Sequence, residues 1–235
     1  MKRKIVDALD ASRMTAVTSG ETALRVSQYF GDAGPFSYQK VRRLTAVLLE
    51  GSMPYEVATA GLRAISFELA RKCNLDVAKL IAECEQFRAK NFYPLKRIEY
   101  PIDRQFSVSL RPETVASVEG TPNLIFLQPR KTATPWAYNV SFLRRILEET
   151  YVPDYFDSAR FWLVDTEADE QGNRALNLVD LQAIAPMSDR EFIRRIAALR
   201  NAWRLHLLHQ NKKPPRPTKP DDRQSGFDFD DGKED

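Results

Sequence analysis

The sequence predicts a mixed α/β fold, because the spacing of apolar residues changes along the chain. Between Gly20 and about Lys90, apolar side chains recur at intervals of three and four residues, which is typical of helices that pack on one another. From Pro94 onward, apolar and polar residues alternate or form short apolar runs, which is typical of β-strands. Helices followed by a strand-rich region indicate a fold in which both kinds of element build the core.

These patterns divide the chain into three segments. We expect a helical N-terminal module over residues 1–92, an α/β domain over residues 93–210 and a disordered tail over residues 211–235. The tail is rich in proline and then in acidic residues, so it cannot bury enough apolar surface to offset the entropy lost on folding. Apolar residues make up 43% of the chain, which is enough for a sizeable core in the rest.

The central part of the chain predicts three successive strands. Residues 106–111 alternate between apolar and polar, so we expect a strand with one face in solvent. Residues 114–118 and 123–130 flank a turn at Gly120, so we expect them to form a hairpin. The elements predicted after this hairpin are a helix at 136–152, strands at 160–166 and 174–181, and a last helix that Ser188 caps.

Few side chains are available for the common catalytic and metal sites. The only cysteines are Cys73 and Cys84, which predicts two small buried side chains instead of a disulfide framework or a thiolate zinc site. The only histidines, His206 and His209, have no third metal ligand beside them and leave a histidine-based triad without candidates. The sequence also lacks phosphate-binding glycine loops, dinucleotide fingerprints and the HExxH zinc motif.

The charge of the chain is uneven. The total is +3, but residues 221–235 hold seven acidic and two basic residues, which leaves +8 on residues 1–220. A basic body is compatible with nucleic-acid binding, and ordinary solubility explains a charge of this size equally well. The last predicted helix offers five arginines that can either follow phosphates or pair with nearby acids: Arg190, Arg194, Arg195, Arg200 and Arg204.

The sequence gives no sign of membrane insertion or secretion. No stretch contains the ~18 uncharged apolar residues that a membrane span requires. Asp7 and Asp10 lie where a signal peptide would have its apolar segment. We therefore expect a cytoplasmic protein.

One motif in the predicted hairpin bears on function. The strand at 106–111 leads into Pro112-Glu113, and after the turn at Gly120 the chain reads LIFLQPRK over residues 124–131. Residues 79–181 also follow the order helix, strand, strand, strand, helix, strand, strand. Both the order of the elements and the motif formed by Glu113 and residues 124–131 resemble the PD-(D/E)XK superfamily of restriction-endonuclease-like nucleases. The resemblance implies a nuclease-like α/β domain that acts on or beside nucleic acid.

The resemblance also implies a Mg²⁺ site for phosphodiester cleavage. Glu113 would bind the metal directly, Gln128 would complete the shell through its amide oxygen, and Arg130 would steady the scissile phosphate. Gln128 and Arg130 depart from the family, which has an acid and a lysine at these places. Lys131 is adjacent to the lysine position, and Glu83 on the preceding helix is a candidate for an additional acidic ligand.

Several interpretations of this face stay open. It can be a metal-dependent nuclease site for DNA or RNA, a non-catalytic nucleic-acid-binding remnant, or the decayed face of a protein-interaction or adaptor subunit. Glu113, Gln128 and Arg130 can also be no more than the polar face of a hairpin. We expect Glu113 to be exposed and to share a face with Gln128, because antiparallel neighbours do so. Glu113 and Gln128 side by side beside an acid would favour the nuclease. Separated side chains, with Arg130 held by a carboxylate, would favour the adaptor.

The tail carries a second, shorter resemblance. Phe227 and Phe229 stand among acidic residues, in a segment similar to the acidic-aromatic tips of bacterial single-stranded-DNA-binding proteins. The similarity implies a segment that docks on a protein partner. The same composition is compatible with a tail that competes with nucleic acid for the basic body, or with one that only aids solubility.

Overall fold

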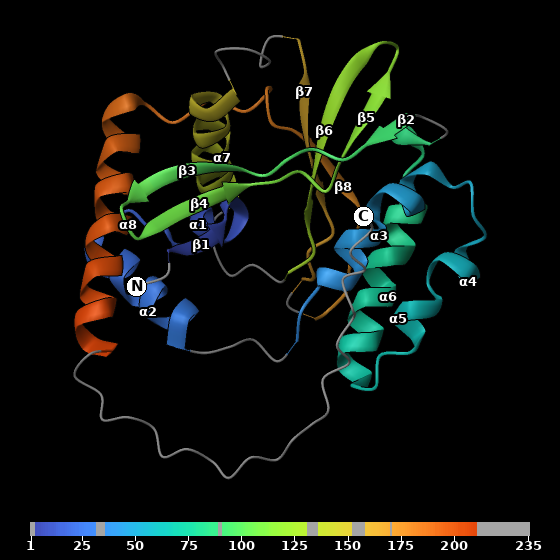
Figure 1. Ribbon diagram of the computed structural model, residues 1–235, viewed down its shortest axis with the longest axis horizontal. Coiled ribbons are helices and arrows are strands. Elements are labelled where there is room, and N and C mark those ends of the chain that lie inside the picture. Colours follow the sequence, from blue (N-terminus) through green and yellow to red (C-terminus); the bar gives the residue numbers. More distant parts are fainter. Residues whose placement is uncertain are drawn as a thin grey trace, which may run out of the picture.

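The computed structural model describes residues 3–31, 36–88, 91–130, 136–151, 158–169 and 171–210. Within these ranges the chain has the mixed α/β fold that the sequence predicts, with two mixed sheets and helices on both sides of the larger one (Figure 1). The predictions for Lys131 and for the tail at 211–235 lie outside the described residues. No described helix is long and apolar enough to cross a membrane.

The larger sheet contains the predicted hairpin. Its strands are ordered β2-β5-β6-β7-β8, with β6 and β7 parallel and the other neighbours antiparallel. The hairpin turn uses Glu119 and Gly120, whose φ angles of 52° and 79° lie in the left-handed region that glycine adopts readily. The strands of this sheet are β2 (Asn91–Tyr93), β5 (Thr114–Val118), β6 (Thr121–Gln128), β7 (Arg160–Asp165) and β8 (Asn177–Asp180).

The smaller sheet has the order β1-β4-β3, and the sequence patterns predict only its central strand. β1 (Lys4–Asp7) runs parallel to β4 (Phe106–Leu110), and β3 (Ile98–Asp103) runs antiparallel to it. β3 contains Pro101 and an irregular register after it, which an edge strand tolerates because the missing N–H is not needed by a further neighbour. Pro101 interrupts the apolar pattern of β3, and β1 is too short, at four residues, to show a pattern. The sequence pattern therefore predicts neither strand.

The prediction that β4 has one face in solvent is wrong. Ser107 and Ser109 are 0% and 8% exposed, so both faces of the strand are covered. β4 is the central strand of its sheet, and α1 (Ala8–Met14) packs on it. Serine is small enough to be buried in such a place, so its alternation with apolar residues does not mark a solvent-facing side.

Helices cover the two faces of the larger sheet. Leu124 and Phe126 of β6 belong to one apolar cluster, together with residues of α7 (Trp136–Tyr151). Ile125 and Leu127 belong to a second cluster with residues of α3 (Gln39–Glu50) and α6 (Glu68–Ala82). Successive side chains of β6 therefore point into two different helical layers. Because both faces of the strand are covered, the strand is apolar throughout. The remaining short elements beside α3 and α6 are α4 (Tyr55–Ala58), α5 (Ala60–Arg63) and η1 (Glu85–Phe87).

The first helices pack against the last ones. α1 contacts α7, and α2 (Ser19–Gly31) lies along α8 (Asp189–Gln210), as the left side of Figure 1 shows. Ser188 caps α8 as predicted, since the N–H of Glu191 donates to its Oγ at 3.4 Å. The division of the chain at residue 92 stays a prediction, but β1, α1 and α2 pack with elements that follow it.

The arginines of α8 mostly have partners within the protein. Arg194 pairs with Glu191, Arg204 pairs with Asp103, and Arg200 donates to the carbonyl of Ile102. The side chain of Arg195 is 1% exposed and hydrogen-bonds Glu191. These contacts favour the interpretation in which the arginines of this helix pair with nearby groups over the one in which they follow phosphates.

The burial of β4 can be tested at Ser107. Ser107→Lys should lower the free energy of unfolding by roughly 2 kcal/mol or more, because the substitution places a charge in the core. Ser107→Ala should not lower it, because the buried Oγ of Ser107 has no hydrogen-bond partner among the described residues. Urea denaturation measures both variants beside Ser27→Lys, a control at an exposed position of α2. Equal stability of the two lysine variants would show that β4 has an open face.

Candidate functional site

The candidate site lies where the chain crosses from the smaller sheet to the larger one. β4 ends at Leu110 and β5 begins at Thr114, so Glu113 lies in the link between the two sheets. Asp7 ends β1, pairs in register with Ser109 of β4, and caps α1 by accepting a hydrogen bond from the N–H of Leu9. The two carboxylates therefore come from neighbouring strand ends although they are far apart in sequence.

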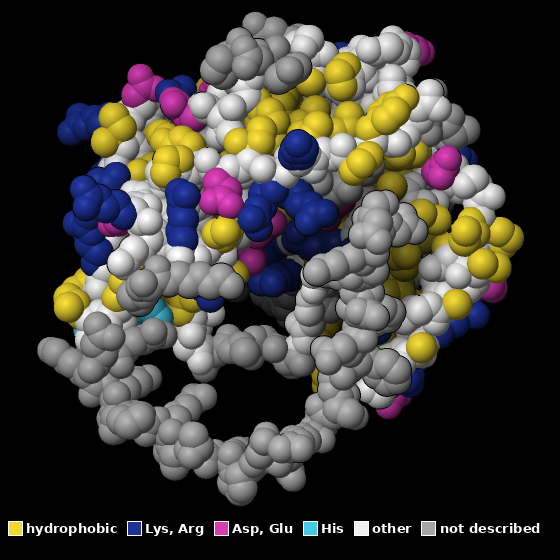
Figure 2. Space-filling model, in the orientation of Figure 1, with side chains coloured by type: hydrophobic (Ala, Val, Ile, Leu, Met, Phe, Trp, Pro, Cys, Tyr) yellow, Lys and Arg dark blue, Asp and Glu magenta, His cyan; other side chains and the backbone are white. Residues whose placement is uncertain are grey.

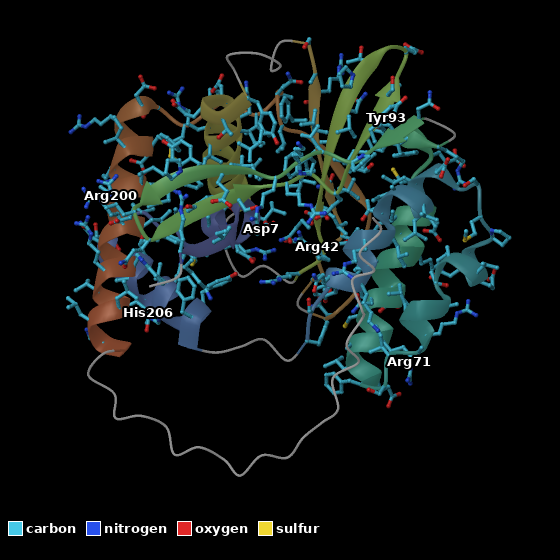
Figure 3. All side chains as sticks on the ribbon, in the orientation of Figure 1. Asp7, Arg42, Arg71, Tyr93, Arg200 and His206 are labelled. Atoms are coloured by element: carbon cyan, nitrogen blue, oxygen red, sulfur yellow. The ribbon has the colours of Figure 1, made fainter. Side chains whose placement is uncertain are left out.

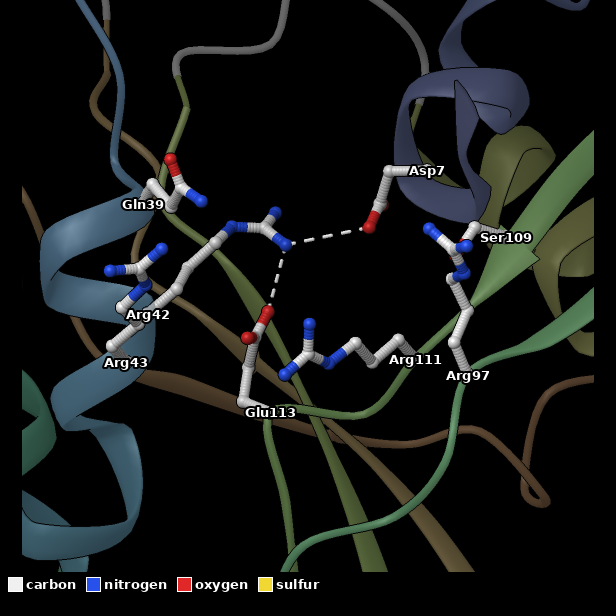
Figure 4. Close-up of a pocket in the computed structure, with 8 residues that line it drawn as sticks. All are labelled: Asp7, Gln39, Arg42, Arg43, Arg97, Ser109, Arg111 and Glu113. Atoms are coloured by element: carbon white, nitrogen blue, oxygen red, sulfur yellow. Dashed lines mark hydrogen bonds and ion pairs between the residues drawn. The ribbon is translucent and has the colours of Figure 1, made fainter. Parts of the chain in front are cut away.

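Arg42 of α3 bridges these carboxylates, and Figure 3 places it between the two sheets, near Asp7. Its Nη1 lies 2.8 Å from Oε1 of Glu113 and 3.5 Å from Oδ2 of Asp7. Its Nη2 donates to the carbonyl of Leu127 at 3.2 Å. Figure 4 shows the guanidinium group between the two acids. One side chain of α3 thus connects β1, the β4–β5 link and the end of β6.

A cavity of about 420 Å³ surrounds this bridge, and we call it the arginine cavity. Its charged lining is four arginines against two acids, so it has an excess of positive charge even when both acids are ionised. Figure 2 shows basic side chains around a hollow at the centre of this face. The lining residues are Asp7, Gln39, Arg42, Arg43, Arg97, Ser109, Arg111 and Glu113.

The acids of the site are costly to ionise. Burial raises the pKa of Glu113 to about 7, although Arg42 acts in the opposite direction. Burial also raises the pKa of Asp7, again against the attraction of Arg42. Burial alone would lower the pKa of Arg42, but the two carboxylates outweigh it and raise that pKa. The site is therefore a partly buried ion-pair cluster in which each charge depends on the others.

The sequence predicted Glu113 to be exposed, and this is wrong. Its side chain is 12% exposed, because α3 and the strand link enclose it. Glu113 still precedes β5 as predicted, and its N–H donates to the carbonyl of Ile125 in the partner strand. Oε1 of its carboxylate, the group proposed to bind the metal, accepts a hydrogen bond from Arg42.

Gln128 ends β6 and is fully buried. It lies beside Asp165 in the β6–β7 register, and the N–H of Thr166 donates to its carbonyl oxygen. The side-chain oxygen Oε1 of Gln128 accepts from the N–H of Arg130 at 3.4 Å. Burial raises the pKa of Asp165 to about 6, so this strand end carries another carboxyl group with a perturbed pKa.

Arg130 is held by a carboxylate. Its Nη1 lies 2.9 Å from Oδ1 of Asp10 on α1, and the same carboxylate group accepts from Tyr29 and Arg13. Glu83 lies at the end of α6 and lines a different cavity, where it pairs with Lys79 at 3.9 Å. The structure thus brings Glu113 and Arg130 to the same charge cluster, each paired with a group of opposite charge, and places Glu83 at a different cavity.

The residues proposed for Mg²⁺ do not form a donor set that fits it. Glu113 is paired with the guanidinium group of Arg42, and Glu83 lines another cavity. The side-chain oxygen of Gln128 accepts a hydrogen bond from a backbone N–H. No group of three or more potential acidic, histidine or cysteine ligands occurs in the part of the chain that the structure describes. A cation at the bridge would have to displace Arg42, which already supplies positive charge there.

Sequence reasoning missed three residues of this region: Asp7, Asp10 and Arg42. Arg42 lies 71 residues from Glu113, and Arg130 lies 120 residues from Asp10, so no local spacing connects these pairs. The one available signal was the pair of acids at Asp7 and Asp10, a cap and a first-turn residue at a helix start.

Comparison with known proteins adds little to this picture. No protein-family model and no curated protein matches the sequence. Among solved structures, the chain is similar to a protein from Eubacterium rectale described as a "Putative exonuclease". The TM-score is 0.42 and the identity is 8%, over 89% of this chain and 82% of that one. A likeness this weak assigns no function to this chain.

The raised pKa of Glu113 predicts a pH-dependent effect of Glu113→Gln. The folded protein binds a proton at Glu113 more tightly than the unfolded chain, so ionisation destabilises the wild type as pH rises from about 4.5 to about 7. Glutamine removes that titration. The stability of the variant relative to wild type should therefore increase over this window, by up to about 3 kcal/mol, and stay constant above it.

Urea denaturation at several pH values between 4 and 8 measures this difference. Glu68→Gln, at an exposed position in the first turn of α6, is the matched control. A difference between Glu113→Gln and wild type that does not change with pH would show that Glu113 is not buried as described.

Proposed function

We propose that this chain binds nucleic acid, and that the arginine cavity holds phosphate groups of the backbone. The observation that carries the proposal is the arrangement in Figure 4, where Arg42 occupies the space between Asp7 and Glu113 and further arginines face the same cavity. Guanidinium groups match phosphate oxygens in charge and geometry. The charge of +8 on residues 1–220 is compatible with the same class of ligand.

Two arginines of the cavity are the best candidates for phosphate contacts. Arg43 and Arg111 are exposed, and no ion pair is found for either within the described residues. Arg42, in contrast, is held by both acids and serves to position the cavity wall. Glu113, the acid of the nuclease-like motif, then has a structural role, since it fixes Arg42.

This arrangement supports a non-catalytic binding protein over a Mg²⁺-dependent phosphodiesterase. Arg130, which the nuclease interpretation assigns to the scissile phosphate, is paired with Asp10. Glu113, assigned to the metal, is paired with Arg42. A carboxylate that holds Arg130 is one of the two features expected of a decayed nuclease-like face, so an adaptor that also binds nucleic acid is compatible with the proposal.

Phosphate binding predicts that Arg43→Ala and Arg111→Ala weaken the binding of labelled DNA and RNA oligonucleotides. Removing one arginine–phosphate interaction should reduce the slope of log K against log salt by about 0.7 for single strands and about 0.9 for duplex DNA. Fluorescence anisotropy over a salt series measures this slope. Arg63→Ala, at an exposed position of α5, should bind as wild type does. Slopes equal to wild type in both cavity variants would contradict the assignment.

A cleavage assay tests the catalytic alternative. With Mg²⁺ and a panel of single- and double-stranded DNA and RNA, we expect wild type and Glu113→Gln to give the same products as a control without protein, because Arg42 already occupies the cation position. Gel analysis over several hours measures the outcome. Mg²⁺-dependent cleavage by wild type that Glu113→Gln abolishes would restore the nuclease assignment.

A further inference from the structure

The arginine cavity has a half-buried floor and an exposed rim. The floor is formed by the ion-paired side chains of Asp7, Arg42 and Glu113. Four exposed residues, from α3 and from the links before β3 and β5, form the rim: Gln39, Arg43, Arg97 and Arg111. Figure 4 shows the guanidinium groups of Arg42, Arg97 and Arg111 around the same open space. A ligand in this space therefore meets cations on several sides.

The net charge of the cavity is larger than one internal phosphate of a strand can neutralise. Four arginines and two acids line the cavity, which leaves a net charge of +2 when both acids are ionised. Glu99, outside the cavity, pairs with Arg97, but Arg3 pairs with the same carboxylate group, so these two charges cancel. An internal phosphodiester carries a single negative charge. A terminal phosphate monoester carries about −1.5 to −2 near pH 7, and Coulomb attraction grows in proportion to charge.

A hydroxyl group at the floor of the cavity is available to a ligand. Ser109 is 8% exposed and lines the cavity, and no hydrogen bond is found for its Oγ within the described residues. Ser109 pairs in register with Asp7 of the parallel strand β1, so the two side chains point to the same face of the sheet. The Oγ of Ser107 is fully enclosed, whereas that of Ser109 is open to the cavity. Polar groups at such depth normally have a partner, and a phosphate oxygen is a suitable acceptor.

The arrangement of these donors suits the end of a strand. An internal phosphate continues into a sugar on two sides and offers two free oxygens, whereas a terminal phosphate offers three and continues on one side only. Ser109 lies at the floor, and Arg43 and Arg111 lie at the rim on different elements, so each can meet a different oxygen. The volume of about 420 Å³ is within the range of ~300–1,000 Å³ found for small-molecule sites.

We infer that the arginine cavity binds the terminal phosphate monoester of a nucleic-acid strand in preference to its internal phosphates, and this inference rests on the proposed function. The monoester neutralises the charge of the cavity and supplies the acceptor for the hydroxyl group of Ser109. The rest of the strand leaves over the exposed rim. A 5′ and a 3′ phosphate carry the same monoester, so the test includes both.

The test uses single-stranded DNA of one sequence, labelled on an internal base, with a phosphate at the 5′ end or at the 3′ end. The control strand has hydroxyl groups at both ends and is two nucleotides longer, so that its extra diesters give it the same total charge. Wild type should bind at least one phosphorylated strand about tenfold to a hundredfold more tightly than the control strand. Fluorescence anisotropy measures this ratio of affinities, which we call the end preference. Methylation of the terminal phosphate to a diester should remove it.

Three variants assign the end preference to the cavity. Ser109→Ala should reduce it by about threefold to tenfold, because the variant lacks the donor at the floor. Ser107→Ala, on the same strand but away from the cavity, should keep the wild-type preference. Arg111→Ala should weaken binding of the phosphorylated strand more than binding of the control strand, because the lost attraction grows with the charge of the phosphate. Urea denaturation checks that each variant is folded.

The outcomes separate this inference from the proposed function. Equal affinity of wild type for phosphorylated and control strands, with binding that weakens as salt rises, would overturn the terminal-phosphate site and leave phosphate binding in place. Absence of binding to every strand at low salt would overturn the proposed function itself. An end preference that both Ser109→Ala and Arg111→Ala leave unchanged would show that the monoester does not bind in this cavity. Displacement of the phosphorylated strand by a nucleoside 5′-monophosphate at lower concentration than by the unlabelled strand would assign the cavity to free nucleotides instead.

Discussion

The junction of the two sheets depends on the ion pairs that Arg42 makes with Asp7 and Glu113. A buried guanidinium group without anions and buried carboxylates without a cation are both costly, so each partner fixes the other two. Because the same side chain also bonds the carbonyl of Leu127, α3 is tied to the ends of β1 and β6 and to the β4–β5 link. The positions of Arg43, next on the helix, and of Arg111, two residues before Glu113, follow from this bridge. The bridge therefore sets where the walls of the cavity lie.

The sequence predicts the elements whose pattern is set by one buried face. α7, α8 and the β5–β6 hairpin are confirmed, because long apolar stripes and a glycine turn leave few alternatives. β1 is too short to show a period, and Pro101 conceals β3. The solvent-facing side expected for β4 was wrong for a different reason, since the burial of Ser107 depends on the strands and helix that surround it. Local pattern cannot show that a strand is central.

The candidate site was predictable only in part. The motif directs attention to Glu113, which lies in the cavity, but it cannot show which cation meets that acid. The answer depends on Arg42, 71 residues earlier in the chain, and on how α3 packs on the sheet. Likewise the pairing of Arg130 with Asp10 joins residues 120 positions apart. Such pairings are products of topology, and the spacing of residues in a single sequence does not encode them.

The balance of charge decides what a cluster of acids at strand ends can do. Carboxylates that exceed the nearby cations attract a metal ion, which can then bind phosphate. Here the arginines lining the cavity outnumber the acids, so the positive charge that phosphate requires is already supplied by the protein. A guanidinium group binds phosphate but does not generate a metal-bound hydroxide, so the proposed function is phosphate binding without that route to hydrolysis. Under the proposed function, the strand ends and the sheet junction of this α/β fold recognise a nucleic-acid strand without cutting it.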